Sequence, residues 1–451
     1  MSAAAEELPA ATRRREQRGW YVYDWANSAF QTTVITVFLG PYLTSLALAA
    51  AGSSGFVRPL GIPVRAGAFY PYLVSFSALL QVVAMPIVGA ITDRTGRRRL
   101  LLGLLAGTGS VATLCLWFVR GQAYLAGGAL FLVASVAFSC SIVVYNAWLP
   151  DIATVEERDA VSSQGWALGY LGGGLLLALN LALFTLADTG GVAVSTADAV
   201  RLSMVSAGAW WALFTVVPLA ILRRPIRPVV EDDGGRVLSS GFRQLGRTFR
   251  RLRAAPATLS FLAAYLLYND GIQTVISQAA VYAQAELLLG QSVTAAAILL
   301  VQFVAVVGAL ALGRIAQRVG AKRTVLGSLI IWIVVLAAAY VLPARAPAPF
   351  FALAAGIGLV LGGSQALSRS LFSHMVPDGA EAEYFSAYEI SDRGTSWLGT
   401  LLFGLAIQIT GSYRIAILSL LVFFVAGFLL LARSDIRRAA EEAGNSAPAR
   451  L

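Results

Sequence analysis

The sequence is organised around two related loops, GAITDRTGRRR at residues 89–99 and GRIAQRVGAKR at residues 313–323. Two further pairs of segments repeat in the same order. They are LPD at 149–151 with VPD at 376–378, and YDWAN at 23–27 with NDGIQ at 269–273. Three such matches indicate that the chain consists of two duplicated halves.

Long apolar segments separate these motifs. Hydrophobic residues make up 57% of the chain and charged residues 13%, with a mean hydropathy of +0.72. A soluble domain averages about 25% charged residues, and a helix needs about 20 apolar residues to cross a bilayer. We therefore expect an all-α membrane protein in which twelve transmembrane helices form two pseudo-symmetric six-helix bundles. The expected helices lie near residues 19–48, 68–91, 100–119, 123–149, 162–187, 199–222, 258–286, 293–316, 324–342, 348–375, 384–409 and 412–432.

The distribution of Lys and Arg predicts how the chain crosses the membrane. Most of them lie in a polar N-terminal tail (1–18), a basic linker (223–257), a polar C-terminal tail (433–451) and loops on one side of the two bundles (19–222 and 258–432). The positive-inside rule therefore places both termini in the cytoplasm. We assign the net charge of +10 to membrane anchoring, with no nucleic-acid partner expected. The opposite side carries Arg58, Arg65, Arg120, Arg201, Arg345 and Arg414.

Duplicated membrane halves are typical of transporters, whose substrate site lies between the halves near the midplane. The sequence shows no nucleophile–base pair, phosphate-binding glycine loop or metal-ligand spacing, so we expect neither an enzyme nor a cofactor or metal site. Because a Walker motif is also missing from the sequence, a proton gradient is the natural source of energy. Facilitated diffusion stays open as an alternative.

Two helices carry a polar face inside an apolar segment. At 3.6 residues per turn, these polar residues share one side of their helix, and polar groups at membrane depth are costly unless they face water or one another. This pattern favours a path for substrate or protons. Alternatively, the helix dipole near the cytoplasmic helix ends accounts for the two aspartates without a transport role. The neighbouring aromatic residues would then form an interfacial belt; they are Trp20, Tyr21, Tyr23 and Trp25. The residues of the two polar faces are Asp24, Asn27 and Gln31 in the first span and Asp270, Gln273 and Ser277 in the seventh.

Arg369 and Glu389 form a further candidate pair. Both lie on the order of 10 Å inside adjacent spans, at a rise of 1.5 Å per residue, and a partner makes each charge tolerable at that depth. Either the pair is a static structural bridge, or Arg369 binds a substrate carboxylate while Glu389 takes up and releases a proton.

The loop at residues 89–99 resembles the signature loop between the second and third helices of the major facilitator superfamily. It would act as a cytoplasmic latch, with glycines permitting the tight turn and Asp93 meeting either a helix N-terminus or an arginine of the other half. Arg393 is the expected arginine partner of Asp93, and Arg97 is expected to reach Asp151. Alternatively, the arginines only anchor the loop. The latch residues are Gly89, Asp93, Arg94, Gly96, Arg97, Asp151 and Arg393.

Several other segments resemble the bacterial "unknown major facilitator" family, which includes the fungal vacuolar amino-acid effluxers linked to autophagy. They are YDWANS (23–28), LPDIA (149–153), GWALGY (165–170), YNDGIQT (268–274), QALSRSLF (365–372) and YEIS (388–391). This resemblance implies efflux of a small neutral amino acid by alternating access.

We therefore expect a secondary active transporter, proton-coupled, that works as a monomer in the cell membrane and moves a small polar organic solute. The alternatives are a polyspecific exporter of drugs, amphiphiles or lipids with the same fold, or a receptor-like protein that does not transport.

Overall fold

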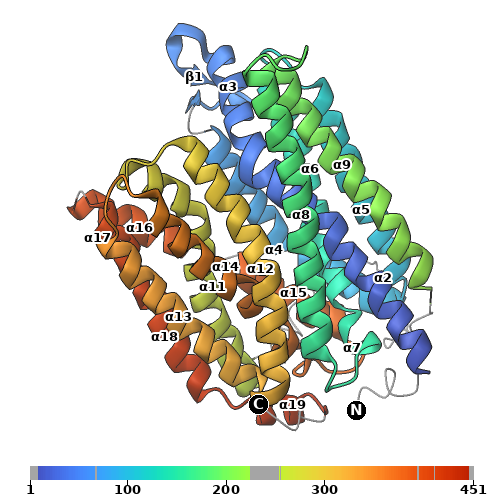
Figure 1. Ribbon diagram of the computed structural model, residues 1–451. Helices are drawn as coiled ribbons and strands as arrows, with labels where there is room; N and C mark the ends of the chain where they lie inside the picture. Colours follow the sequence, from blue (N-terminus) through green and yellow to red (C-terminus); the bar gives the residue numbers. More distant parts are fainter. Residues whose placement is uncertain are drawn as a thin grey trace.

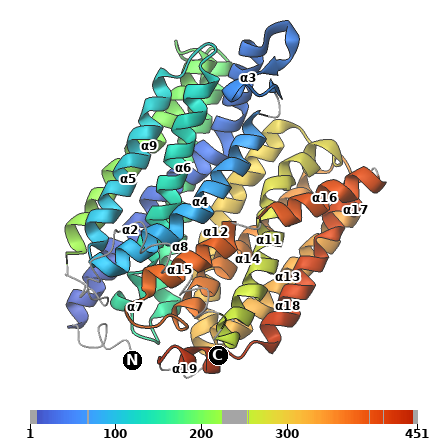
Figure 2. The same ribbon diagram turned by 180° about the vertical axis from the view of Figure 1, so that it is seen from behind.

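The computed structural model describes residues 9–66, 69–223, 253, 255–393, 396–410 and 412–445 (Figures 1 and 2). Within these residues, the structure is a bundle of long helices with one two-stranded hairpin. The start of α2 (Ala10–Ala29) and the short helix α19 (Ile436–Glu442) lie at one end of the bundle, here called the terminus side. The hairpin lies at the opposite end, here called the hairpin side.

The first half begins with a continuous helix made of α2 (Ala10–Ala29), the π-helical segment η1 (Phe30–Phe38) and α3 (Leu39–Ala51). The 3-10 turns η2 (Gly52–Ser54) and η3 (Pro59–Gly61) and the antiparallel strands β1 (Phe56–Val57) and β2 (Val64–Arg65) follow. The remaining helices are α4 (Phe69–Thr95), α5 (Arg98–Cys115) with the 3-10 turn η5 (Leu116–Phe118), α6 (Tyr124–Asn146), α7 (Leu149–Ile152), α8 (Arg158–Asp188) and α9 (Thr196–Ile221).

The second half has a similar order of helices. They are α11 (Pro256–Ala285), α12 (Gln291–Val319), α13 (Ala321–Val341), α14 (Pro347–Ser373), α15 (Glu381–Arg393), α16 (Ser396–Thr410), α17 (Tyr413–Ser419), α18 (Leu421–Arg433) and the short α19 (Ile436–Glu442). Each half has its own buried apolar core, built around Trp20 and Trp211 in the first and around Trp332 and Phe372 in the second.

Among the described residues, ten helices are long and apolar enough to cross a membrane, so the chain is a multi-pass membrane protein. Helix α11 is not among the ten, because Asn269, Asp270 and Gln273 interrupt its apolar sequence. Helices α15 and α16 occupy the place of the eleventh expected span, and α15 carries several charges. The expected number of twelve spans and the cytoplasmic placement of the termini remain predictions.

The repeated loops form the tight turns that their glycines predict. Gly96 (φ +61°) ends α4, and Gly320 (φ +100°) separates α12 from α13. A side chain at either position would be strained, because L-residues rarely adopt positive φ.

Both expected tails are more ordered than their polar composition suggested. Helix α2 begins at Ala10, where Arg13 pairs with Glu157 at 2.8 Å and the Gln17 side-chain amide donates to the Ile152 carbonyl at 2.9 Å. At the other end, α19 buries Ile436, Ala439 and Ala440. Local contacts with neighbouring helices therefore order segments that the sequence placed in tails. Most of the expected linker, 224–252, lies outside the described residues.

Candidate transport site

A cavity of about 730 Å³ lies between the two halves. It extends from the hairpin-side parts of α4, α12 and α14 towards the terminus side, where charged residues line it. Its polar lining comes from both halves and includes Asp24, Asn27, Ser28, Gln31, Thr32, Gln81, Ser135, Asn146, Gln273, Ser277, Gln302, Gln365, Arg369 and Glu389.

Asp24 and Arg369 form an ion pair across the two halves. Their closest oxygen and nitrogen atoms are 3.4 Å apart, and both residues are almost fully buried. The Tyr145 hydroxyl donates to the same Asp24 oxygen at 2.7 Å. Two opposite charges therefore lie together at the closed end of the cavity, each available to a ligand of the other sign.

Aromatic rings and a serine hold the Arg369 guanidinium in place. Its central carbon lies 4.8 Å from the ring centre of Trp20 and 5.5 Å from that of Trp166, within the range of cation–π attraction. Arg369 also donates to the Ser162 hydroxyl at 2.8 Å and to the Ser162 carbonyl at 2.9 Å. The guanidinium is thus positioned before any ligand arrives.

Asn146 links Arg369 to Glu389. Arg369 donates to the amide oxygen of Asn146 at 3.3 Å, and the amide nitrogen of Asn146 donates to Glu389 at 2.9 Å. The predicted direct pairing of Arg369 with Glu389 is therefore wrong, because the ion pair of Arg369 is with Asp24 and an amide stands between the two predicted partners.

Glycines of α8 allow α2 to approach closely enough to form this site. A Cβ atom at Gly165 would lie 2.6 Å from the Asp24 carboxylate and 3.1 Å from the Arg369 guanidinium. At Gly169 it would lie 2.7 Å from the Ser28 hydroxyl, and at Gly172 it would lie 2.8 Å from the Trp25 carbonyl. Real Cβ atoms essentially never come this close, so a larger residue would displace side chains of the site at Gly165 and Gly169 and the backbone of α2 at Gly172.

The structure brings most of the predicted site residues to the cavity. Asp24, Asn27 and Gln31 line it from the first half, and Gln273, Ser277, Arg369 and Glu389 line it from the second. Asp270 does not line the cavity, contrary to the prediction. It is 1% exposed and lies beside α16. Asp270 shares a helix face with Ser277 but lies about two turns closer to the start of α11, where α16 packs against that face.

Some cavity residues were missed in the sequence. Gln81 on α4 and Gln302 on α12 are isolated polar residues within apolar helices, which is a usable signal of a polar path. Asn146 and Trp166 gave no such signal, because they lie close to helix ends where polar and aromatic residues are common.

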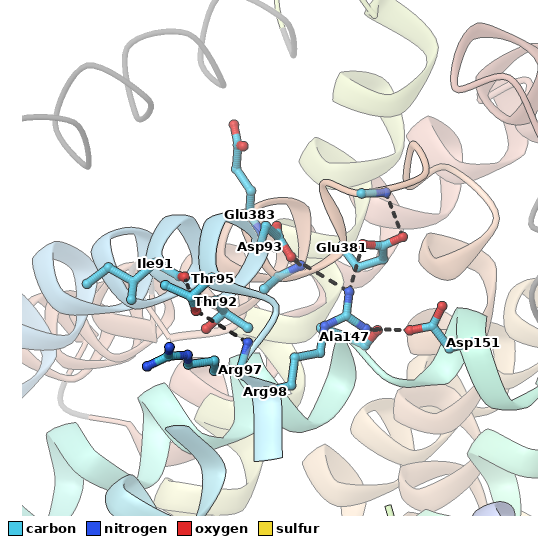
Figure 3. A network of polar contacts seen from close by, with 12 residues as sticks. Ile91, Thr92, Asp93, Thr95, Arg97, Arg98, Ala147, Asp151, Glu381 and Glu383 are labelled. Carbon is cyan, nitrogen blue, oxygen red and sulfur yellow. Dashed lines mark hydrogen bonds and ion pairs between the residues drawn. The ribbon is translucent and has the colours of Figure 1, made fainter. Parts of the chain in front are cut away.

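On the terminus side of the cavity, the loop at residues 89–99 connects the two halves (Figure 3). The Asp93 carboxylate accepts hydrogen bonds from the backbone amides of Ala382 at 3.1 Å and Glu383 at 2.8 Å, in the first turn of α15. Gly89 allows this approach, since a Cβ there would lie 2.6 Å from the Ala382 carbonyl oxygen. Of the two expected partners of Asp93, the helix N-terminus is the one observed. The side chain of Arg393 lies outside the described residues.

Arg98 is the arginine that joins the latch. It contacts Asp151 at 2.5 Å and Glu381 of the other half at 2.8 Å (Figure 3). The prediction that Arg97 reaches Asp151 is wrong, because Arg97 is exposed at the N-cap of α5 while Arg98 shares the buried face of that helix with Leu102. Arg94 is partly exposed near the end of α4.

A second layer of contacts lies between this latch and the cavity. Arg158 on α8 donates to the Ser373 carbonyl at 2.8 Å and contacts Nδ1 of His374 at 3.3 Å. The Ser370 hydroxyl donates to Asp159 at 2.6 Å, and the Ser162 hydroxyl donates to the Ala366 carbonyl at 2.7 Å. The two halves are therefore joined along the terminus side of α8 and α14.

Two helical halves joined at one side, with a polar cavity between them, define a transporter of the major facilitator superfamily. Solved structures with this fold include the transporter FucP in its outward conformation, with a TM-score of 0.67, 12% identity and coverage of 94% of this chain and 99% of that one. The proton:xylose symporter XylE bound to 6-bromo-6-deoxy-D-glucose has a TM-score of 0.69, 13% identity and coverage of 94% and 96%. At this identity, the likeness concerns the fold.

The chain belongs to the family described as "Vacuole effluxer Atg22 like", whose model matches residues 12–444. It is 30% identical to the "Uncharacterized MFS-type transporter YxiO" of Bacillus subtilis, over 93% of this chain and 94% of that protein. It is also 24% identical to "Autophagy-related protein 22-1" of Penicillium rubens, over 96% of this chain and 92% of that protein.

Proposed function

We propose that the protein exports small neutral amino acids across the cell membrane by alternating access, driven by a proton gradient, and that it acts as a monomer. The observation that carries this proposal is the Asp24–Arg369 pair at the closed end of the cavity. An amino acid offers an ammonium group and a carboxylate, so it can replace the ion pair with two matched contacts.

The chemistry of the two sides fits this substrate class. Arg369 presents a planar fork of donors, which suits a carboxylate. Asp24 accepts charge-assisted hydrogen bonds on the other side, and Glu389 supplies a second carboxylate through Asn146. A cavity of about 730 Å³ falls within the range of about 300–1,000 Å³ common for small-molecule sites. Apolar residues such as Phe131, Phe138 and Ile142 line its walls and suit an uncharged side chain.

The direction of transport is proposed from the family and the predicted topology. The family description names an effluxer, and positively charged loops favour cytoplasmic termini. In that orientation, the latch of Asp93, Arg98 and Glu381 closes the cytoplasmic side. The structure then corresponds to the state of the transporter after it has released its substrate on the outer side of the membrane.

Proteoliposomes preloaded with an unlabelled amino acid test the proposal through uptake of labelled leucine or alanine by counterflow. We expect uptake that is inhibited by other neutral amino acids and not by the matching amines or carboxylic acids, because each analogue offers one of the two charges. The variants Asp24→Asn and Arg369→Gln should lose this uptake, whereas the exposed control Arg97→Gln should keep it. Equal inhibition by amines, or uptake unchanged in Arg369→Gln, would contradict the proposed site.

A further inference from the structure

Asp270 is a buried carboxyl group in the middle of α11. The residue is 1% exposed, and neither of its carboxylate oxygens has a hydrogen-bond partner among the residues that the structure describes. An unpaired carboxylate is costly to bury in an apolar interior, and intramembrane ionisable groups of this kind are commonly functional. Asp270 therefore needs a neutralising ligand.

The carboxyl group lies at the contact between α11 and α16. Gly399 of α16 approaches α11 so closely that a Cβ there would lie 2.1 Å from the Thr274 hydroxyl and 3.2 Å from the Asp270 carbonyl oxygen. The Gly399 amide is directed towards the Asp270 side chain without completing a hydrogen bond. Thr274, one turn along from Asp270, has a buried hydroxyl that is likewise unpartnered within the described part of the chain.

No described charge neutralises Asp270. The influences on its side chain are burial and the Gly399 amide. Arg369 pairs with Asp24, and Glu389, which accepts a hydrogen bond from Asn146, carries a charge of the same sign as Asp270. The side chains of Asp392 and Arg393 lie outside the described residues. The other charged residues on the elements packed against α11 are Arg314, Arg318, Glu381, Glu383, Arg414, Arg433, Arg437, Arg438, Glu441 and Glu442.

We propose that Asp270 is a proton-binding site between α11 and α16, separate from the substrate cavity. A proton neutralises the carboxylate without any further ligand. A metal cation would need a shell of several oxygen atoms, and the described contact offers few beyond those of Asp270 and Thr274. The proton adds to a carboxylate oxygen in the closed contact and leaves to water when the contact opens, with no other bond changed.

This inference rests on the proposed function, because it assigns the coupling ion to a residue. Substrate in the cavity cannot touch Asp270, since Asp270 does not line it. Gln273 and Ser277 of the same helix do line it, so a movement of α11 during transport changes the contact with α16. Proton binding and substrate binding are thereby linked through one helix.

Infrared difference spectroscopy of the purified protein at neutral pH tests the protonation directly and needs no substrate. We expect the carbonyl band of a protonated carboxyl group in the unmodified protein and its loss in Asp270→Asn. The matched control Asp188→Asn, which changes an exposed aspartate at the end of α8, should keep the band. If Asp270→Asn does not fold, Asp270→Glu should shift the band instead of removing it.

A spectrum in which Asp270→Asn retains the full band would overturn the assignment. Loss of the band on adding sodium at constant pH would overturn it as well, because it would show that a metal ion competes for the carboxylate. In proteoliposomes, proton flux coupled to amino-acid transport, followed with an internal pH dye, should be lost in Asp270→Asn. If the unmodified protein moves no amino acid while the infrared result holds, the proposed substrate fails and the proton site stands.

Discussion

Replacing Gly89 by alanine places a methyl group against the backbone of the other half. The added Cβ would lie 2.6 Å from the Ala382 carbonyl oxygen and 3.3 Å from the Cα of Glu383. Neither atom belongs to a flexible side chain, so α4 must move away from α15. That movement also lengthens the hydrogen bonds from the Ala382 and Glu383 amides to Asp93. In the open state that alternating access requires, the two helices would separate and no such clash would arise.

Overpacking of this kind costs about 1–3 kcal/mol. Because the cost falls on the closed state alone, the ratio of open to closed molecules should rise by about 5- to 150-fold. The assay uses a cysteine at Ser386, which is 2% exposed and lies one turn from Ala382 on the same face of α15. With Cys115 and Cys140 replaced by serine, the labelling rate of this cysteine by a maleimide reports the open fraction.

Gly107→Ala is the matched control, since a Cβ at Gly107 meets no atom within 4 Å. We expect it to leave the labelling rate unchanged. If Gly89→Ala also leaves the rate unchanged, the close approach of α4 and α15 does not hold the terminus side closed, and the role assigned to the latch is refuted.

Three further outcomes follow from the buried contacts. Arg98→Ala should lower the stability of the protein by about 3 kcal/mol or more in thermal unfolding, because it leaves buried carboxylates unpaired, while Arg97→Ala should change it little. Asn445→Ala removes hydrogen bonds to the His374 carbonyl at 3.0 Å and the Val376 carbonyl at 2.6 Å, and should cost about 1–3 kcal/mol in the same assay; no change would show that the C-terminal segment is not anchored. Burial and the Arg158 charge hold the pKa of His374, just beyond the end of α14, well below its ordinary value of 6.5. The unfolded chain therefore binds a proton that the folded one does not, so stability should fall as the pH drops below 6.5, and His374→Gln should reduce that dependence.

The general architecture could be predicted from the sequence because two of the sequence signals, the long apolar segments and the loop glycines, are strong. Apolar segments of membrane-spanning length seldom occur in soluble domains, and the glycines of the repeated loops do form turns at positive φ. The start of α2 at Ala10 could not be predicted from the sequence. Its first turns are polar, and they are ordered by contacts to Glu157 and Ile152, which are distant in the sequence.

The site was predicted in part for the same reason. Helical phase correctly grouped Asp24, Asn27 and Gln31, since residues on one helix face turn together. Phase within a helix does not say which neighbour that face meets, which is why Arg369 was paired with Glu389 instead of Asp24. Arg98 could have been distinguished from Arg97, because it continues the buried positions Leu102 and Ala106 of α5.

The π-helical segment η1 allows part of the first span to rotate about the helix axis. Its backbone pairs residues five apart, whereas an α-helix pairs residues four apart, so each wide turn holds one surplus residue. The side chains of Gln31, Thr32, Ile35 and Thr36 face the cavity from this segment. If the wide turn moved along the chain, the residues that it passed would rotate by about 100° about the helix axis. Nearly all backbone hydrogen bonds would stay formed, as the bilayer requires. The wall of the cavity can in this way exchange its side chains without any helix having to unwind.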